Sequence, residues 1–354
     1  MADELKKFRE QIDRIDGDLL RLFNERARLA QQIGHAKGES AVLRPEREAQ
    51  ILRRMQEANP GPLSSAAVAQ LYTEIMSQCR ALEAPLKVAY LGPHGTFSEA
   101  AMFQRFGQAA EGIPTDNIDG VFTAVENGTA NYGLVPVENS TEGAVGRTLD
   151  LLLNSSLKIC GEVLLQVHQC LMSNESDLSF VRKVYSHPQS FGQCQGWLNA
   201  HLPHAERITA ASNADAARMA AQESYAAAIA GERAAQHFKL KVLVQNIEDD
   251  ARNTTRFLVL GSQDVAPSGK DKTSLVMSAA NRPGAVHDLL TPLAKHGVSM
   301  TKLESRPARS GLWEYVFFVD IEGHQREEKV AAALAELKQV AAFVKVLGSY
   351  PVAV

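Results

Sequence analysis

The feature that most constrains this chain is an apolar heptad repeat near its N-terminus. The repeat predicts one helix over residues 5–36, about 50 Å long at a rise of 1.5 Å per residue. A helix of this length is far longer than the helices of a small domain, so we expect its apolar stripe to pack against a second chain. The stripe is continuous when Arg26 is counted with its apolar members, which are Leu5, Phe8, Ile12, Ile15, Leu19, Leu22, Leu29, Ile33 and Ala36.

Arg26 occupies a core position of this repeat, where an apolar side chain is expected. A buried arginine is costly unless it meets an anion, so the position indicates either an intersubunit salt bridge or a bound anionic ligand. Lys37 lies eleven residues later, about three turns, and shares this face of the helix. Arg9 points elsewhere, but it could still serve a site on a partner chain.

Two shorter helices are predicted after the long one. The first begins at Pro45, a favoured first-turn residue, and the second follows the break at Asn59-Pro60-Gly61-Pro62. Ala84-Pro85 ends this helical block. We therefore predict an all-α domain over residues 1–84, with its shorter helices at 45–58 and 64–83.

The character of the sequence changes at Lys87, where short apolar runs begin to alternate with helical segments. This alternation predicts a mixed α/β domain, which we place at residues 86–263. Its clearest predicted strands are 88–91, 132–137, 159–171 and 256–260, with helices beginning near 98 and spanning 145–153.

A polar stretch with Pro267 and Gly269 is typical of a linker and separates a last domain at residues 270–354. The predicted order there is strand, helix, two strands, helix and strand, which is the ferredoxin-like α+β arrangement. The six elements are expected at 273–280, 284–296, 298–304, 313–321, 326–339 and 343–347.

The composition of this 354-residue chain fits two or three globular domains. A net charge of −4 indicates neither a nucleic-acid nor a membrane partner. The sequence contains no apolar run of about 18 residues, so we expect no membrane span. The charged N-terminus is unlike a signal peptide, which favours a cytoplasmic location. We expect reduced thiols and no metal site, because the four cysteines lie far apart without ligand spacing: Cys79, Cys160, Cys170 and Cys194.

The helical block resembles the all-helical chorismate mutase family over about 80 residues. The resemblance implies an intertwined homodimer in which Arg9 reaches the neighbouring subunit's site, while Arg26 and Lys37 hold the substrate carboxylates. Chorismate is a dianion and its rearrangement is pericyclic, so a cationic pocket that compacts the substrate is sufficient. Arg47 and Glu48 match the next helix's contribution, with Glu48 at the substrate hydroxyl, and Cys79 and Glu83 complete the pattern.

Two of these positions depart from the commonest bacterial pattern of the family. Cys79 stands where a serine is frequent, and Glu83 stands where a glutamine often donates a hydrogen bond to the ether oxygen. An ionised carboxylate can only accept hydrogen bonds, so Glu83 must be protonated to take this role. We therefore predict a mutase activity that falls as pH rises.

Four short polar strings lie at predicted strand ends of the α/β domain, where backbone N–H groups can face anions. They are GPHGTFS at 92–98, VPVENSTEG at 135–143, SHPQ at 186–189 and NTTRF at 253–257. The first lacks the glycine spacing and the Lys-Ser/Thr ending of nucleotide-binding loops. Together the strings resemble the prephenate dehydratases over about 175 residues, a family with two α/β lobes around a cleft, as in periplasmic solute-binding proteins.

This second resemblance implies that Thr255, in the signature Thr-Arg-Phe, is the proton donor or relay to the hydroxide that leaves with CO₂. Asn139, Ser186 and Gln193 match cleft positions that orient the substrate. The residues alone also allow Thr255 to form an ST-turn or a helix cap. Arg256 has two interpretations, a carboxylate ligand or a salt bridge that fixes the strand end.

Two strings in the last domain resemble the phenylalanine-binding motifs of the amino-acid-sensing ACT domain. They are NRPGAV at 281–286 and ESRP at 304–307. The resemblance implies that phenylalanine binds between two subunits and inhibits the dehydratase, which requires tighter binding to the less active state. The implied contact positions are Asn281, Gly284, Ala285, Val286, Glu304, Ser305 and Arg306.

Together the resemblances predict a bifunctional enzyme of phenylalanine biosynthesis that works without a cofactor. Two alternatives stay open from the residues: a non-catalytic cytosolic amino-acid-binding regulator, and a mutase fused to a prephenate dehydrogenase. A regulator would need neither Thr255 nor the cationic pair Arg26 and Lys37. A dehydrogenase would need the dinucleotide fingerprint that this sequence lacks.

Overall fold

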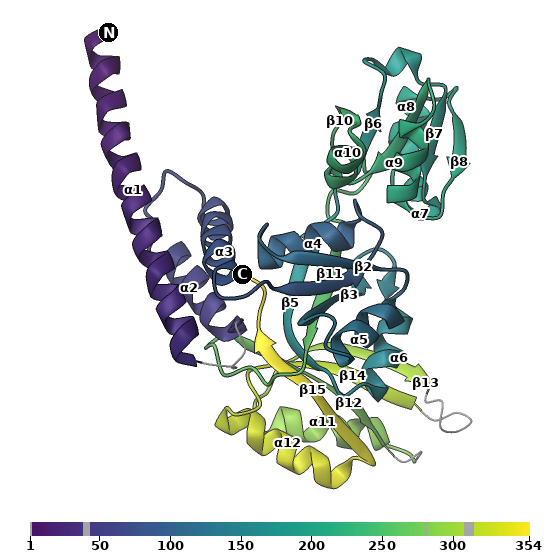
Figure 1. Ribbon diagram of the computed structural model, residues 1–354. Helices are drawn as coiled ribbons and strands as arrows, with labels where there is room; N and C mark the ends of the chain where they lie inside the picture. Colours follow the sequence, from purple (N-terminus) through teal and green to yellow (C-terminus); the bar gives the residue numbers. More distant parts are fainter. Residues whose placement is uncertain (1, 38–42, 280–281, 308–314) are drawn as a thin grey trace.

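The computed structural model describes residues 2–37, 43–279, 282–307 and 315–354, which form three parts (Figure 1). A helical part comes first, two α/β lobes follow, and a four-stranded sheet with two helices ends the chain. The second α/β lobe and the C-terminal sheet lie at opposite ends of the first lobe (Figure 1). This architecture confirms the predicted combination of all-α, two-lobed α/β and ferredoxin-like α+β parts.

The helical part has one long and two shorter helices, as the sequence predicts. α1 (Ala2–Lys37) is continuous, and its N-terminal half extends beyond α2 and α3 (Figure 1). α2 (Pro45–Glu57) begins with its proline in the first turn. Ser64 caps α3 (Ser65–Ala81), because its side chain accepts a hydrogen bond from the Ala67 N–H at 3.2 Å.

The heptad stripe of α1 is left exposed by the other residues that the structure describes. Leu5, Phe8, Ile12 and Ile15 each expose between 56% and 58% of their surface. Most of the stability of an amphipathic helix comes from packing its apolar face, so a helix that leaves this face in water lacks its main support. The contact with a second chain stays a prediction, and this exposed stripe is the observation behind it.

The first α/β lobe is built on a mixed sheet in the order β2-β1-β3-β11-β5, with β4 paired to β3. β1, β2 and β3 are parallel, while β11 runs antiparallel between β3 and β5. The strands are β1 (Lys87–Leu91), β2 (Glu111–Thr115), β3 (Tyr132–Asn139), β4 (Gly143–Ala144), β5 (Lys158–Gln166) and β11 (Thr254–Gly261). The helices are α4 (Phe97–Phe106), α5 (Ile118–Glu126) and α6 (Gly146–Asn154).

The second lobe is inserted between β5 and β11 and has its own sheet, in the order β10-β6-β9-β7-β8. Its central strand consists of alanines and one isoleucine that are all buried, which lets the flanking helices pack closely. Its strands are β6 (Cys170–Ser173), β7 (Lys183–Ser186), β8 (Glu206–Thr209), β9 (Ala226–Ala230) and β10 (Lys241–Val244). Its helices are η1 (Leu178–Phe180), α7 (Pro188–Gln193), α8 (Gln195–His201), α9 (Asn213–Ala221) and α10 (Glu232–Phe238).

The single strand predicted over 159–171 is wrong. The structure divides this apolar run into β5, in the first lobe, and β6, in the second. The chain crosses between the lobes at Val167, whose N–H donates to the Asn253 carbonyl at 2.8 Å on the returning segment. Apolar runs that belong to two different sheets adjoin here in the sequence, so hydrophobicity alone could not separate them.

The C-terminal part confirms the predicted order of elements, with a sheet in the order β13-β14-β12-β15. Its elements are β12 (Asp271–Ser278), α11 (Ala285–Lys295), β13 (Met300–Pro307), β14 (Tyr315–Glu322), α12 (Glu328–Val340) and β15 (Phe343–Pro351). Residues 280 and 313–314, at the ends of two predicted strands, lie outside the described residues.

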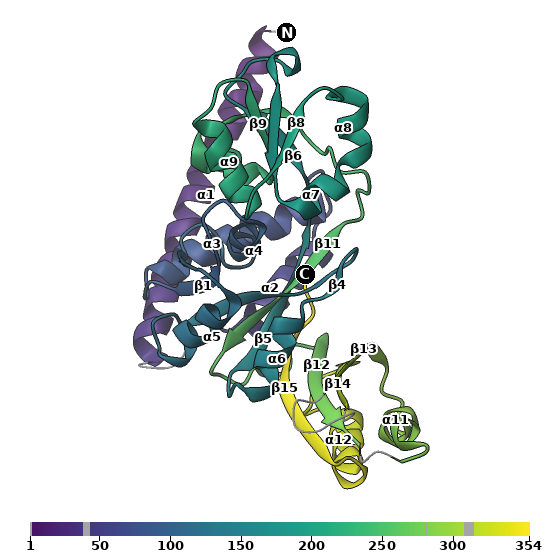
Figure 2. The ribbon, with the colours of Figure 1, turned by 90° about the vertical axis from the view of Figure 1, so that its right-hand side faces the viewer.

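The C-terminal sheet packs directly on the first α/β lobe, below it in Figure 2. Val276, Phe318 and Leu347 belong to the same buried cluster as residues of the first lobe, so one hydrophobic core spans both. Gly348 in β15 lies against β5, where a Cβ atom would be 2.2 Å from the Ile159 carbonyl oxygen. The two sheets therefore approach too closely there for any side chain.

The predicted linker is packed rather than free. Val265, Ser268 and Asp271 are all buried, and Arg53 of α2 donates a hydrogen bond to the Ser268 hydroxyl at 2.6 Å. The side chain of Asp271 accepts from the Ser268 N–H at 2.7 Å, which closes a tight turn. This segment thus ties the helical part to the C-terminal sheet.

All four cysteines are free and buried. Burial raises the pKa of the Cys160 thiol to about 12 and also raises the pKa of Cys170 and Cys194, so these thiols stay protonated at neutral pH. Within the described ranges, no helix is both long and apolar enough to cross a membrane.

Candidate active and regulatory sites

The first candidate site lies between α1 and α3. Arg26 donates a hydrogen bond from Nη1 to the Cys79 sulfur at 2.9 Å, so the heptad arginine turns toward α3. Glu83 lies just beyond the end of α3, against α1, where a Cβ on Gly34 would be 2.8 Å from its Cγ. The structure thus brings Arg26, Cys79 and Glu83 to the same pair of helices.

Other predicted residues of the helical part lie apart from this group. Arg9 is exposed on the free half of α1, about 25 Å from Arg26 along the helix axis at 1.5 Å per residue. Within one chain it cannot join the Arg26 group. Lys37 is the last residue of α1, and its side chain lies outside the described residues.

Glu48 lies between two arginines. It forms ion pairs with Arg80 of α3 and, at 2.8 Å, with Nη1 of Arg105 in α4 of the first α/β lobe. Arg80 also donates to the Phe106 carbonyl at 2.6 Å. Arg47 precedes Glu48 in α2 and has no ion pair among the contacts of the described residues. Sequence reasoning missed Arg80 and Arg105, because nothing in their local patterns marks them.

The second candidate site begins at the ends of β3 and β11. Asn139 and Thr255 are cross-strand partners, and Asn139 donates from Nδ2 to the Thr255 hydroxyl oxygen at 2.9 Å. The side-chain oxygen Oδ1 of Asn139 accepts hydrogen bonds from the backbone N–H groups of Thr141 and Glu142 at 3.0 and 3.1 Å, which fixes the orientation of the side-chain amide. The Thr255 hydroxyl therefore already accepts one hydrogen bond, and its own proton remains available.

Ser186 and Gln193 lie in the second lobe, at opposite ends of α7. Ser186 is fully buried at the end of β7, with its hydroxyl 3.4 Å from the Asn213 side-chain oxygen. Gln193 accepts from Gln169 at 3.0 Å. Among the described residues, no hydrogen bond joins this group to Asn139 or Thr255, so the two halves of the expected cleft belong to different lobes.

The lobes touch through a cluster of polar side chains beside α4. Glu99 accepts hydrogen bonds from Tyr90 at 3.0 Å and from the Gly95 N–H at 2.9 Å, and its carboxylate is 2.8 Å from His94 Nδ1. Arg233, from α10 of the second lobe, reaches the same carboxylate at 3.3 Å. Burial alone would raise the pKa of Glu99, but these hydrogen bonds and the charge of Arg233 hold it below its usual range.

Arg256, in the signature Thr-Arg-Phe, forms salt bridges rather than facing an open site. Its Nε lies 2.7 Å from Glu162 in β5, and its Nη1 lies 2.6 Å from Asp320 in β14. Its Nη2 donates to the Tyr350 hydroxyl at 2.9 Å. This confirms the salt-bridge interpretation of Arg256, with partners in both the first lobe and the C-terminal sheet.

The expected phenylalanine motifs lie at the start of α11 and along the edge strand β13. Gly284 has a φ of 78°, a left-handed conformation that favours glycine, and it is followed by Ala285 and by Val286, which is 41% exposed. In β13, Ser305 is exposed and Glu304 is half-buried. Arg306 forms an ion pair with Asp150 of α6 at 3.2 Å, and Asn281 lies outside the described residues.

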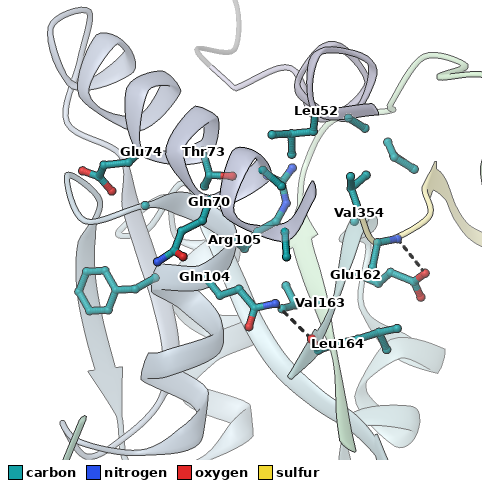
Figure 3. Close-up of a pocket in the computed structure, with 18 of the residues that line it drawn as sticks. Leu52, Gln70, Thr73, Glu74, Gln104, Arg105, Glu162, Val163, Leu164 and Val354 are labelled. Atoms are coloured by element: carbon teal, nitrogen blue, oxygen red, sulfur yellow. Dashed lines mark hydrogen bonds between the residues drawn. The ribbon is translucent and has the colours of Figure 1, made fainter. Parts of the chain in front are cut away.

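A cavity of about 1160 Å³ lies where the three parts meet. Figure 3 shows Leu52 of α2, Gln104 of α4 and the C-terminal Val354 around it. Gln104 donates to the Leu164 carbonyl at 3.2 Å on one wall. None of the predicted site residues lines this cavity, although Arg105, Glu162 and Arg233, which contact the groups described above, do.

Comparisons with known proteins cover all three parts. Family models match residues 8–84 as chorismate mutase type II, residues 88–265 as prephenate dehydratase and residues 273–339 as the ACT domain. A bifunctional chorismate mutase/prephenate dehydratase of Neisseria gonorrhoeae is 52% identical over 98% of this chain and 96% of its own length. The protein of the same name from Pseudomonas aeruginosa is 49% identical over 99% of both chains.

Two solved structures resemble the last two parts of the chain. Prephenate dehydratase of Arthrobacter aurescens in complex with L-Phe is 34% identical, with a TM-score of 0.70 over 75% of this chain and 90% of its own. A quorum-quenching acylase, GqqA, is 30% identical with a TM-score of 0.70, over 75% of this chain and 98% of its own. The fold of these parts is thus shared by a dehydratase and an acylase. The relatives that match nearly the whole chain, including the helical part, are bifunctional chorismate mutase/prephenate dehydratases.

Proposed function

The chain belongs to the family of bifunctional chorismate mutase/prephenate dehydratases, and we propose that its two reactions take place at separate sites. We also propose that the C-terminal ACT domain binds phenylalanine and regulates the second reaction. As a member of this family, the enzyme converts chorismate to prephenate and prephenate to phenylpyruvate. The assignment of residues to each step is our proposal.

For the mutase, Arg26 supplies the cation at which the substrate carboxylate binds. Its guanidinium is held toward α3 by Cys79, and Glu83 follows the same helix α3 and lies against Gly34 of α1, so a cation and a carboxyl group lie between the same two helices. The rearrangement breaks and makes bonds within one molecule and therefore requires neither a nucleophile nor a cofactor. Binding the compact conformer and stabilising the separating charge lower its barrier.

The mutase site requires two subunits. Arg9 lies too far along α1 to meet Arg26 of its own chain, and the apolar stripe between them is exposed. Pairing α1 with its copy in a homodimer would bury the stripe and carry Arg9 to the partner's pocket. Lys37, Arg47 and Glu48 complete the proposed set.

For the dehydratase, the observation that carries the proposal is the hydrogen bond from Asn139 to the Thr255 oxygen at 2.9 Å. Because the oxygen accepts from Asn139, the hydroxyl proton points away from it and can be donated to the departing hydroxide. The ring hydroxyl leaves as water, the carboxylate leaves as CO₂, and the electron pair of the broken C–C bond completes the aromatic ring. Ser186 and Gln193 would orient prephenate from the second lobe as the lobes enclose it.

Phenylalanine is the proposed ligand of the C-terminal sheet. The Arthrobacter relative was solved with L-Phe, and this chain carries a left-handed glycine before α11 and the Glu304–Arg306 segment on β13, the strand at one edge of the sheet. Inhibition follows if phenylalanine binds more tightly to the less active state. A cytoplasmic location accords with a biosynthetic role.

The deciding experiment supplies chorismate alone, without cofactor, and follows phenylpyruvate with and without phenylalanine. We expect phenylpyruvate to form and phenylalanine to slow its formation. Thr255→Ala should halt the reaction at prephenate, whereas Arg26→Ala should stop it at chorismate and leave added prephenate convertible. Full dehydratase turnover by Thr255→Ala would overturn the assigned role, and Thr254→Ala serves as the matched control on the same strand.

A further inference from the structure

Four charged residues join the dehydratase site to the C-terminal sheet. Glu138 of β3 and Arg256 of β11 are cross-strand partners in one sheet, and Lys302 of β13 and Asp320 of β14 are cross-strand partners in the other. Lys302 Nζ lies 2.8 Å from Glu138 Oε2, and Arg256 Nη1 lies 2.6 Å from Asp320 Oδ2. Two adjacent strands of one sheet are thus bound to two adjacent strands of the other, and we call these four residues the sheet link.

The Arg256 end of the sheet link is held from several sides. The side chains of Arg256 and Asp320 are only 11% and 9% exposed, so water screens their attraction weakly. Glu162 and Tyr350 occupy the other nitrogens of Arg256, and Ser274 donates to the second oxygen of Asp320. Buried charges that are fully hydrogen-bonded in this way define one relative position of the strands that carry them.

Both ends of the sheet link border proposed sites. Glu138 precedes Asn139, and Arg256 follows Thr255, in strands whose successive side chains point to opposite faces. The link therefore contacts β3 and β11 on the face of the sheet opposite to the side chains of Asn139 and Thr255. At its other end, Lys302 lies two residues before Glu304, where the second proposed phenylalanine motif begins.

We propose that the sheet link positions Asn139 and Thr255 and transmits phenylalanine binding to them, an inference that rests on the feedback inhibition proposed above. Lys302 and Asp320 are positioning residues in this account, because they act through Glu138 and Arg256 rather than on substrate. A displacement of β13 by phenylalanine would move β3 and β11 together. A misplacement on the order of 1 Å at a reacting group can cost about 100-fold in rate.

The packing beside the sheet link leaves room for such a displacement. A small hollow of about 20 Å³ borders Arg256, Lys302 and Asp320 between the two sheets. This volume corresponds to about one water molecule, so side chains do not completely fill the space beside the sheet link.

Lys302→Met in the full-length enzyme tests the proposal, because methionine keeps the length of the side chain and removes its charge. We expect the phenylalanine concentration for half-inhibition of the dehydratase to rise about tenfold, within the range of ordinary coupling energies. The dissociation constant for phenylalanine, measured by calorimetry, should change less than twofold. Mutase activity of the same chain should stay unchanged and report on folding.

Lys345→Met is the matched control. Lys345 also leaves the C-terminal sheet to contact the first lobe, where its Nζ donates to the carbonyls of Leu152, Leu153 and Ser155 at 2.6 to 3.0 Å. It touches neither β3 nor β11 in these contacts, so inhibition should remain as in the unmodified enzyme. Equal loss of inhibition in both variants would mean that any loosening of the interface suffices, and would overturn the proposal.

Two further variants separate positioning from a merely structural role. Asp320→Asn should lower dehydratase kcat with little change in KM, because the Thr255 strand shifts while the binding groups of the second lobe remain. Lys302→Arg restores the cation and should recover inhibition. In the unmodified enzyme, phenylpyruvate should weaken phenylalanine binding, and Lys302→Met should remove this reciprocal effect.

The outcomes distinguish the two levels of inference. If Lys302→Met binds phenylalanine and is inhibited like the unmodified enzyme, the sheet link carries no signal. If Lys302→Met loses phenylalanine binding altogether, Lys302 belongs to the ligand site and the proposal is equally overturned. An unmodified enzyme that phenylalanine neither binds nor inhibits would instead refute the proposed regulation itself.

Discussion

The carboxylate of Glu48 in the mutase part accepts a hydrogen bond of 2.8 Å from Arg105 in the dehydratase part. A residue proposed for one active site is thus oriented by the domain that carries the other. Arg80 reaches the second oxygen of the same carboxylate from α3. Both oxygens of Glu48 are therefore occupied by cations, which fixes the orientation of its side chain.

Arg105→Gln should lower mutase kcat/KM about tenfold, since a hydrogen bond to a charged group contributes about 1.5 kcal/mol or more. Dehydratase activity measured with added prephenate should change less than twofold. Arg53→Gln is the control, because Arg53 also extends from the mutase part, to Ser268, without touching Glu48. An equal loss of mutase activity in both variants would point to loosened domains rather than to Glu48.

The parts of the fold that were predictable depend on local periodicity. The heptad run gives α1 almost residue for residue, and the order of elements in the last part follows from alternating patterns. β5 and β6 adjoin in the sequence on either side of Val167 but belong to different sheets, and the apolar pattern does not show where one sheet ends and the other begins. A long helix also says nothing about which side chains will cover its stripe.

The candidate sites divide in the same way. Thr255 and Asn139 lie in recognisable strings, whereas the contacts that orient them join residues far apart in sequence. Lys302 and Glu138 are separated by 164 positions, and Arg105 and Glu48 by 57. Such pairs form only when the domains pack, so a single sequence contains no local signal for them. Their formation across a shared interface is a property of the folded chain alone.

Glu83→Gln should test the hydrogen bond that position 83 makes to the substrate. The glutamine amide can donate to the ether oxygen, whereas an ionised carboxylate can only accept. We expect Glu83→Gln to keep mutase activity and Glu83→Leu, which has no donor, to lower it. The measurement is mutase kcat/KM for both variants and the unmodified enzyme. Full activity of Glu83→Leu would show that Glu83 has no such role.

Gly34→Ala should separate helix stability from mutase activity. Alanine favours an internal helical position by about 1 kcal/mol over glycine, which should raise the thermal midpoint of the helical part. The added Cβ would lie 2.8 Å from Glu83 Cγ, so the glutamate must turn away. We expect mutase kcat to fall several-fold at the same time. Gly17→Ala, at a position with open space, should stabilise α1 without this loss.

Gly348→Ala should weaken the docking of the C-terminal sheet on the first lobe. Its Cβ would meet the Ile159 backbone oxygen, which cannot move without disturbing β5. Overpacking of this kind costs about 1–3 kcal/mol, and the denaturant midpoint should fall accordingly. Gly192→Ala, which lies in α7 and meets nothing within 4 Å, should not lower the midpoint. Unaltered stability of Gly348→Ala would mean that the two sheets can separate at little cost.

Glu99 should make the contact between the two dehydratase lobes sensitive to acid. Burial opposes its charge, but hydrogen bonds from His94, Gly95 and Tyr90 and the charge of Arg233 lower its pKa below the ordinary value of 4.5. A pKa that is lower in the folded state stabilises the fold above the unfolded pKa, and the contribution disappears as pH falls through the folded pKa. Its effect is therefore complete at pH 7 and shrinks progressively below pH 4.5.

Glu99→Gln tests this dependence, because glutamine keeps the shape and loses the charge. At pH 7 the free energy of unfolding should fall by about 1–3 kcal/mol, since Arg233 and His94 lose their charged acceptor. The difference from the unmodified enzyme should narrow in denaturant titrations repeated at pH 4.5 and 3.5. Asp119→Asn removes a carboxylate from an exposed pair with Arg147 and should change little at any pH. A Glu99→Gln deficit that stayed constant down to pH 3.5 would show that packing, and not the carboxylate charge, holds the lobes together there.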